Sequence, residues 1–203
     1  MKMHIIPMLL AAVLISACGQ PQPPQLKQAT LLQPAKTITG FQLTDHEGKP
    51  FTHANLKGKW SFAFFGYTHC PDVCPTALSM LARVMRKLEK DNSLEELPQA
   101  VFFSVDPERD TPGLLKKFVP YFHPDFIGVT GDPQQLRQLT RQIGIMYGKA
   151  PGGDKNNYLV DHSASIFLFD PDGDFLALFG TPHDPDLIAQ GFITIKNYYE
   201  ASR

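Results

Sequence analysis

Two cysteines separated by three residues are the side chains in this sequence best suited to chemistry. Cys70 and Cys74 lie in the stretch YTHCPDVCP, residues 67–75, between a strongly apolar run and a segment with helical periodicity. Near the start of a helix, exposed N–H groups and the helix dipole stabilise a thiolate and lower its pKa. The position therefore favours both redox chemistry and metal binding. A three-residue spacing gives a looser dithiol than C-x-x-C and accommodates a metal ion.

The elements that must position these cysteines follow from hydrophobic periodicity. Residues 60–67 form an aromatic-rich apolar run, which predicts a central strand covered on both faces. Residues 76–90 carry apolar side chains three and four apart, which predicts a helix with Pro75 in its first turn. The rest of the chain predicts a hairpin near Phe41, strands at 100–105 and 126–130, helices at 112–121, 133–147 and 186–199, and a hairpin formed by 165–169 and 175–179.

This order of elements predicts an α/β fold, with a mixed central sheet flanked by helices and a small N-terminal hairpin. The length of 203 residues and the 43% hydrophobic content suit one domain with short extensions. A net charge of -1 gives no basic surface, so a nucleic-acid partner is not expected. With only three cysteines, a disulfide-stapled framework is not expected either.

The N-terminus accounts for the third cysteine. An apolar run over residues 5–15 is too short to cross a bilayer, and it leads into LISAC at residues 14–18. This stretch resembles the lipobox of bacterial lipoproteins, in which the signal is cut before a cysteine that becomes lipidated. We therefore expect a signal peptide at 1–17, a lipid anchor on Cys18 with a Pro/Gln-rich tether to residue 36, and a folded domain at 37–203. The alternative is an incidental cysteine behind a conventional cleavage site.

Lipidation of Cys18 would place the protein on the exported side of a membrane, facing the periplasm or another extracytoplasmic space. Thiols tend to oxidise in such compartments. Cys70 and Cys74 are therefore expected to be exposed to the hazard of oxidation.

Three stretches together resemble the Sco/SenC family of copper-handling proteins: residues 66–75, SVDPERDTP at 104–112, and DHS at 161–163. They occur in the family's order, and the similarity runs from about Phe41 to the C-terminal helix. The resemblance implies a thioredoxin-like fold and a copper site made by Cys70, Cys74 and His162, with one copper per chain as Cu(I), Cu(II) or both. It also implies delivery of copper to the binuclear centre of cytochrome c oxidase, with the copper-centre subunit and other periplasmic copper chaperones as partners.

The donor types agree with copper. Cu(I) is soft and prefers thiolates in low coordination, and imidazole binds both oxidation states. A structural zinc site needs four closed ligands, so zinc would require His69 or water as the fourth. A three-ligand site also leaves one position open for a partner's ligand, which metal transfer requires.

Several neighbouring side chains have a structural interpretation beside a functional one. Asp161 could support the His162 ring or face solvent, because adjacent residues on a strand point to opposite faces. His69 is interpreted as a rim residue. Within residues 106–111, Asp110 or Thr111 is expected to cap a helix, and a docking role stays open. The remaining histidines, His46, His53, His123 and His183, are expected on the surface, and the methionines are expected in the core.

Three functions fit these residues. The first is a copper metallochaperone. The second is a thiol-disulfide oxidoreductase, in which Cys70 and Cys74 reduce the cysteines of the oxidase copper centre or of another exported partner. The third and weakest is a thiol peroxidase. His162 discriminates among them, since a copper site uses the imidazole and a reductase or peroxidase has no need of it.

Overall fold

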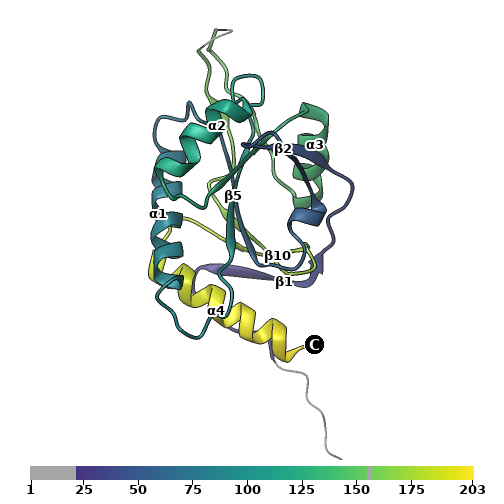
Figure 1. Cartoon of the computed structure of the whole chain (residues 1–203), viewed down its shortest axis with the longest axis vertical. Helices are drawn as coiled ribbons and strands as arrows, with labels where there is room; N and C mark the ends of the chain where they lie inside the picture. Colours follow the sequence, from purple (N-terminus) through teal and green to yellow (C-terminus); the bar gives the residue numbers. More distant parts are fainter. Residues whose placement is uncertain (1–21, 155–156) are drawn as a thin grey trace, which may run out of the picture.

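An eight-stranded mixed sheet forms the centre of the computed structural model, which describes residues 22–154 and 157–203 (Figure 1). The strand order is β1-β10-β9-β4-β5-β6-β2-β3. β4, β5 and β6 run parallel, and the other neighbours are antiparallel. The strands are β1 (Ala29–Lys36), β2 (Gln42–Asp45), β3 (Pro50–Thr52), β4 (Ser61–Gly66), β5 (Gln99–Ser104), β6 (Ile127–Thr130), β9 (Ile166–Phe169) and β10 (Phe175–Phe179). The predicted mixed sheet, both hairpins and the central strand are confirmed.

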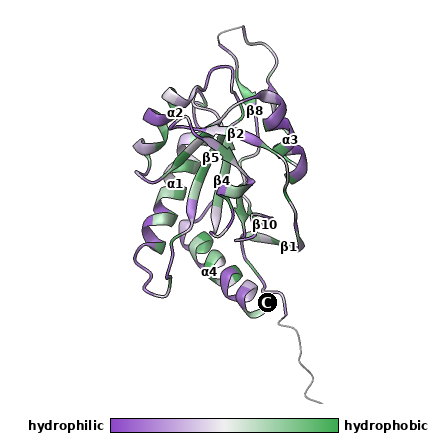
Figure 2. Ribbon diagram, turned by 45° about the vertical axis from the view of Figure 1, so that its right-hand side comes forward, coloured by the Kyte–Doolittle hydropathy of each residue, from purple (hydrophilic) through white to green (hydrophobic). Residues whose placement is uncertain are grey.

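Four α-helices flank the sheet: α1 (Val73–Leu88), α2 (Pro112–Phe118), α3 (Pro133–Ile143) and α4 (Pro185–Ala201). In Figure 1, α1 and α2 lie on one side of β5 and α3 lies on the other, while α4 crosses the lower end and packs on α1. Short 3-10 turns, η1 (His53–Asn55) and η2 (Val119–Tyr121), complete the set. Hydrophobic residues lie along the central strands and α1 (Figure 2), and most of them are buried.

β4 lies in the middle of the sheet, between β9 and β5, and all six of its residues are buried. Its phenylalanines face both layers of the core; Phe65 stacks on Phe103 of β5 with ring centroids 4.8 Å apart. A strand that is buried on both faces and hydrogen-bonded to a neighbouring strand at each edge is rigid. The residues that directly follow it therefore have a well-defined position. The cysteine pair is attached to this strand.

The folded part begins earlier than the sequence predicts. β1 lies within the segment expected to be a tether, and it pairs antiparallel with β10 through Ala29↔Phe179, Thr30↔Leu178 and Leu31↔Ala177. The segment contains proline and glutamine and has no clear hydrophobic alternation, so the sequence does not predict a strand there. It becomes a strand because it forms hydrogen bonds with the apolar strand β10. The part of the tether that lies in residues 29–36 is therefore a sheet edge.

Helix α3 is shorter than the predicted 133–147. It starts as expected at Asp132, whose carboxylate accepts from the N–H groups of Gln134 and Gln135 at 2.8 and 3.1 Å. It ends at Ile143 because Gly144 adopts a left-handed conformation with φ 78°, which terminates a helix. Met146 then lies on the surface, 87% exposed, instead of in the core.

The predicted signal peptide and the lipid anchor at Cys18 lie outside the described residues. Among residues 22–154 and 157–203, none of the helices combines the length and apolar character needed to span a bilayer.

Candidate metal centre

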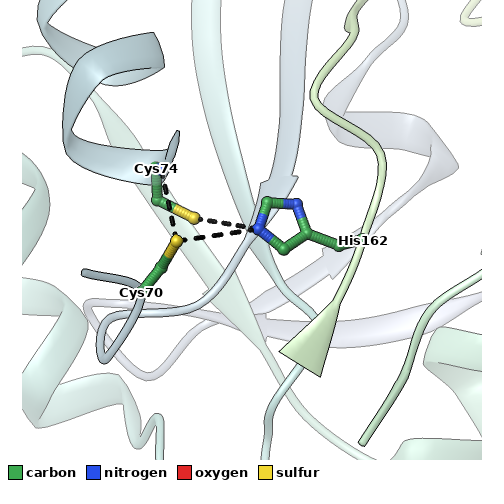
Figure 3. A group of neighbouring side chains, drawn as sticks. All are labelled: Cys70, Cys74 and His162. Atoms are coloured by element: carbon green, nitrogen blue, oxygen red, sulfur yellow. Dashed lines mark hydrogen bonds between the residues drawn. The ribbon is translucent and has the colours of Figure 1, made fainter. Parts of the chain in front are cut away.

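Cys70, Cys74 and His162 converge at one end of the sheet (Figure 3). Nε2 of His162 lies 3.3 Å from Sγ of Cys74 and 3.9 Å from Sγ of Cys70. One ligand atom from each residue lies within 4.8 Å of the other two. The structure therefore brings together the three residues that the sequence predicts as metal ligands.

The loop between β4 and α1 places the two sulfurs. The Cys70 N–H donates to the carbonyl of Tyr67 at 3.3 Å, which turns the chain directly after the strand. Cys74 lies in the first turn of α1, and its N–H donates to Sγ of Cys70 at 3.4 Å. Gly66 makes room for this arrangement, because a Cβ at that position would lie 2.6 Å from Sγ of Cys74.

The two cysteines differ in environment. Cys74 is fully buried, whereas Cys70 is partly exposed. Burial raises the pKa of the Cys74 thiol, and the nearby Cys70 and Asp110 act in the same direction. At Cys74 this desolvation outweighs the lowering expected from the helix start. A bound cation would reverse the effect, since metal coordination favours the thiolate.

His162 follows a small hairpin of β7 (Gly148–Lys149) and β8 (Val160–Asp161). Its Nδ1 lies 2.9 Å from the backbone carbonyl of Ser163, so Nδ1 carries the proton and donates. Nε2 is the ring nitrogen that faces the sulfurs. The backbone carbonyl thus holds the imidazole in the orientation that a metal ligand needs.

Aromatic rings enclose the imidazole. Phe64 and Tyr67 meet its ring edge-to-face, with centroids 6.0 and 5.7 Å away. On the outer side His162 lines an open hollow with the exposed Met146 and residues of β7. The imidazole therefore has a packed inner wall and an open outer side, and within the site Cys70 and His162 are the partly exposed residues.

Asp161, His69 and Thr111 are three of the residues to which the sequence gives a possible role near the site. The Asp161 side chain is exposed. The backbone carbonyl of Ser163, and not the Asp161 carboxylate, is the hydrogen-bond partner of the imidazole Nδ1. His69 bonds with Thr68 and its side chain is 54% exposed, as expected of a rim residue. Thr111 caps α2 through a 3.3 Å bond from the Leu114 N–H.

Asp110 has a role that sequence reasoning misses. It is fully buried and accepts from the Ser104 hydroxyl at 2.6 Å, the Thr68 hydroxyl at 2.6 Å and the Thr68 N–H at 3.0 Å. These bonds tie the cysteine loop to the end of β5. The one sequence signal is that Asp110 lies in a polar stretch directly behind a buried strand.

A second group of metal-type side chains contains Glu89, His123 and Asp125. His123 is 4% exposed, so the expectation of a surface histidine is wrong for this residue. Its Nδ1 accepts the Asp125 N–H at 3.3 Å, and its Nε2 lies 3.0 Å from Glu89. Both nitrogens thus have protein partners, which identifies a satisfied buried histidine. The other three, His46, His53 and His183, are partly buried as well.

The donor set of the candidate centre suits copper. It combines two sulfurs and one imidazole nitrogen, a soft set of low coordination number. No fourth histidine, cysteine or carboxylate joins the group among the described residues, so a closed tetrahedral zinc site is not formed by them.

Comparison with known proteins gives a consistent result. The family model described as SCO1/SenC matches residues 29–197. The SCO2-like protein of Rickettsia felis is 36% identical over 182 residues, which cover 89% of this chain and 87% of that protein. The chain spans only 45% to 65% of the mitochondrial SCO homologs of Mus musculus, Arabidopsis thaliana and Bos taurus.

Comparison with solved structures points to the same family. Bradyrhizobium japonicum ScoI with copper bound is 42% identical, with a TM-score of 0.68 over 80% of this chain and 99% of that one. BsSco, in which a disulfide switch was identified and which is described as a member of the Sco family of cytochrome c oxidase assembly proteins, is 26% identical, with a TM-score of 0.63 over 83% of this chain and 94% of that one. The predicted thioredoxin-like fold is confirmed by these matches.

Proposed function

This chain belongs to the SCO1/SenC family, and from that premise we propose that it binds copper through Cys70, Cys74 and His162 and passes it to the binuclear copper centre of cytochrome c oxidase during assembly. The observation that carries the proposal is the convergence of Nε2 of His162 on two cysteine sulfurs, 3.3 and 3.9 Å away, while Nδ1 lies 2.9 Å from the Ser163 carbonyl. One copper ion per chain is the stoichiometry that this single site supports.

The accessibility of the site supports transfer. Cys74 is buried, while Cys70 and His162 are partly exposed and His162 lines an open hollow. An incoming ligand from the copper-centre subunit can therefore reach the ion from the exposed side while Cys74 still holds it. Another copper chaperone of the same compartment could load the site by the reverse route.

A second function has its own support in the closeness of the two thiols. The Cys74 N–H, in the first turn of α1, donates to Sγ of Cys70 in the preceding loop at 3.4 Å, and the two sulfurs lie within 4.8 Å of each other. In a reductase reaction the Cys70 thiolate would attack a partner's disulfide, and Cys74 would then release the partner as a dithiol. The chain's own pair becomes a disulfide, so the two electrons balance. The disulfide switch identified in BsSco supports this alternative.

The anchor completes the proposal. Lipidated Cys18 would hold the domain on the extracytoplasmic face of a membrane, next to the membrane-bound oxidase. Residues 22–28, which precede β1, form no helix or strand and would link the anchor to the sheet edge, with Leu26 already packed against the core.

An anaerobic Cu(I) titration followed by X-ray absorption tests the binding step. We expect one copper per reduced chain with sulfur ligands, and His162→Ala should weaken binding at least tenfold while thiol exchange changes little. Asp161→Ala is the matched control, because the neighbouring side chain is exposed and should leave affinity unchanged within twofold. A copper site without sulfur ligands would refute the proposal.

A mixed incubation separates the two functions. The copper-loaded protein is incubated with an apo copper-centre domain, and both copper movement and thiol oxidation are scored. Copper appearing on the acceptor with the chain's thiols still reduced supports the chaperone. Oxidation of Cys70 and Cys74 in step with reduction of an oxidised acceptor, without copper movement, supports the reductase.

A further inference from the structure

His162 is carried by a segment with little regular structure of its own. The hairpin before it has two-residue strands, extended by a bond from the Ala150 N–H to the Leu159 carbonyl at 2.8 Å. A two-stranded ribbon of this size is not stable alone. The position of the imidazole must therefore be fixed by contacts with another part of the fold.

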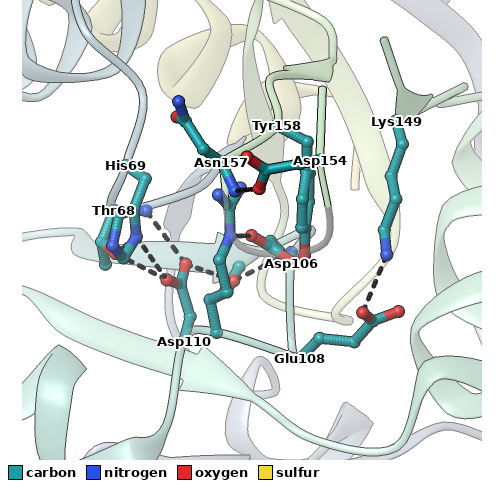
Figure 4. A network of polar contacts seen from close by, with 11 residues as sticks. Thr68, His69, Asp106, Glu108, Asp110, Lys149, Asp154, Asn157 and Tyr158 are labelled. Atoms are coloured by element: carbon teal, nitrogen blue, oxygen red, sulfur yellow. Dashed lines mark hydrogen bonds and ion pairs between the residues drawn. The ribbon is translucent and has the colours of Figure 1, made fainter. Parts of the chain in front are cut away.

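Tyr158 provides several of these contacts. It lies four residues before His162, is only 6% exposed, and donates its hydroxyl to Oδ1 of Asp106 at 2.7 Å. The Arg109 guanidinium lies over its ring, 3.6 Å from the centroid, and the Lys149 ammonium lies 4.3 Å from it. Figure 4 shows Tyr158 and Asp106 in contact, with the Lys149–Glu108 pair beside them.

The anchor of Tyr158 is itself buried and paired. Asp106 is 3% exposed and forms an ion pair with Arg109 through its other oxygen, Oδ2. A carboxylate that accepts from both a guanidinium and a phenol has its oxygens satisfied, and such charge-assisted bonds are the stronger kind. Removing the phenol hydroxyl therefore deletes one defined bond while the Asp106–Arg109 pair persists.

The same turn, residues 106–110, also holds the cysteine side of the site. Asp110 bonds to the hydroxyl and N–H of Thr68, two residues before Cys70. Arg109 lies 5.6 Å from the centroid of Tyr67, whose ring meets the imidazole of His162 edge-to-face. One turn at the end of β5 thus contacts both ligand-bearing segments.

We propose that Tyr158 is a positioning residue, which sets the place of the His162 imidazole relative to the two sulfurs from the fixed 106–110 turn. The proposal rests on the copper site proposed above. Tyr158 does not touch the site itself, so its effect must pass through His162. That dependence distinguishes positioning from a general contribution to stability.

Tyr158→Phe in the full chain is the test, because it keeps the ring and its cation contacts and removes one hydroxyl. We expect Cu(I) affinity to fall about fivefold, the effect of one lost hydrogen bond, and the nitrogen hyperfine pattern of the Cu(II) form to change. In a His162→Ala background, Tyr158→Phe should cause no further loss of affinity. Tyr121→Phe is the matched control, since Tyr121 is 86% exposed and should leave all three measurements unchanged.

A metal-free measurement separates this proposal from the copper site. In the apo protein, amide exchange of Ala150, whose N–H bonds across the hairpin, should be faster in Tyr158→Phe than in wild type and unchanged in Tyr121→Phe. If wild type binds no copper through sulfur but Ala150 exchange still rises, the site assignment fails while the hairpin anchor stands. An equal loss of affinity with and without His162, or unchanged affinity, spectrum and exchange, would overturn the proposal.

Discussion

Sγ of Cys74 lies 3.3 Å from Nε2 of His162, although the two residues are 88 positions apart in the chain. The two meet because β4 and β9 are antiparallel neighbours, with Phe64 opposite Ile166. Cys74 comes shortly after the end of β4, and His162 shortly before the start of β9, so the sheet register brings them to the same edge. The candidate metal centre is thus a product of strand pairing as much as of the C-x-x-x-C loop.

Gly66→Ala should disturb this edge directly. A Cβ at position 66 would lie 2.6 Å from the Cys74 sulfur and 3.0 and 3.1 Å from the rings of Phe64 and Phe102. None of these neighbours is the free end of a flexible chain, so we expect a loss of about 1–3 kcal/mol in unfolding free energy. Copper affinity should fall at least tenfold, because Cys74 must move. Chemical denaturation and Cu(I) competition measure the two effects.

Gly113→Ala provides the control for that substitution. Gly113 lies in α2, and an added Cβ would meet nothing within 4 Å. Alanine should leave copper affinity unchanged and stabilise the helix by about 0.5–1 kcal/mol. If Gly66→Ala behaved like Gly113→Ala, the close packing of Cys74 against β4 would be refuted.

The two thiols should react in a fixed order. Thiolate is the nucleophile, and burial raises the pKa of Cys74, so little Cys74 thiolate exists at neutral pH. Iodoacetamide should therefore modify the partly exposed Cys70 first, and Cys74 labelling should rise about tenfold per pH unit below its pKa. Peptide mass spectrometry at several pH values measures both. Faster labelling of Cys74 than of Cys70 in the reduced apo protein would contradict the buried position.

The same shift predicts how stability depends on pH. In the unfolded chain a cysteine has a pKa of about 8.5, and in the folded protein the pKa of Cys74 is higher. Below pH 8.5 both states are protonated and the thiol costs nothing. Above it the unfolded chain ionises first, so the unfolding free energy of the apo protein should fall as pH rises. Cys74→Ser should reduce this alkaline loss in the same denaturation experiment.

How far the sequence predicts the structure depends on how local each signal is. The apolar run of β4 and the three-and-four spacing of α1 are contained in their own segments, so these elements and the cysteine pair between them could be predicted. The position of His162 depends on which strands pair, and the residues around His162 do not predict that pairing. The residues alone support the cysteines, and the resemblance to a family supplied the histidine.

The contacts that position the site were harder still to predict. Asp110 and Tyr158 act through buried hydrogen bonds to distant segments, and a single polar residue carries no periodic signal for such a bond. β1 was missed for a related reason, since its order depends on β10. In each case the deciding partner lies far away in the sequence.

Strand β1 should contribute measurably to stability. Deleting residues 19–36 removes its pairing with β10 and exposes that apolar strand as an edge. We expect a loss of about 2–4 kcal/mol in unfolding free energy and greater aggregation by light scattering. Deleting residues 19–24, which precede β1 and the Gln28 contacts to the loop after β10, is the control and should leave stability unchanged. Equal stability of the two deletions would show that β1 adds nothing.

Cys18 should determine whether the protein stays with the membrane. A single acyl chain gives only reversible binding, whereas an anchor with several chains is stable, so loss of the modified cysteine should release the protein. In cells that process bacterial lipoproteins, Cys18→Ser should abolish incorporation of labelled fatty acid and shift the chain from the membrane to the soluble fraction. Cys70→Ser is the matched control, because it also removes one thiol and should keep both label and membrane association. Continued fatty-acid labelling of the Cys18→Ser chain would show that this cysteine is not the anchor.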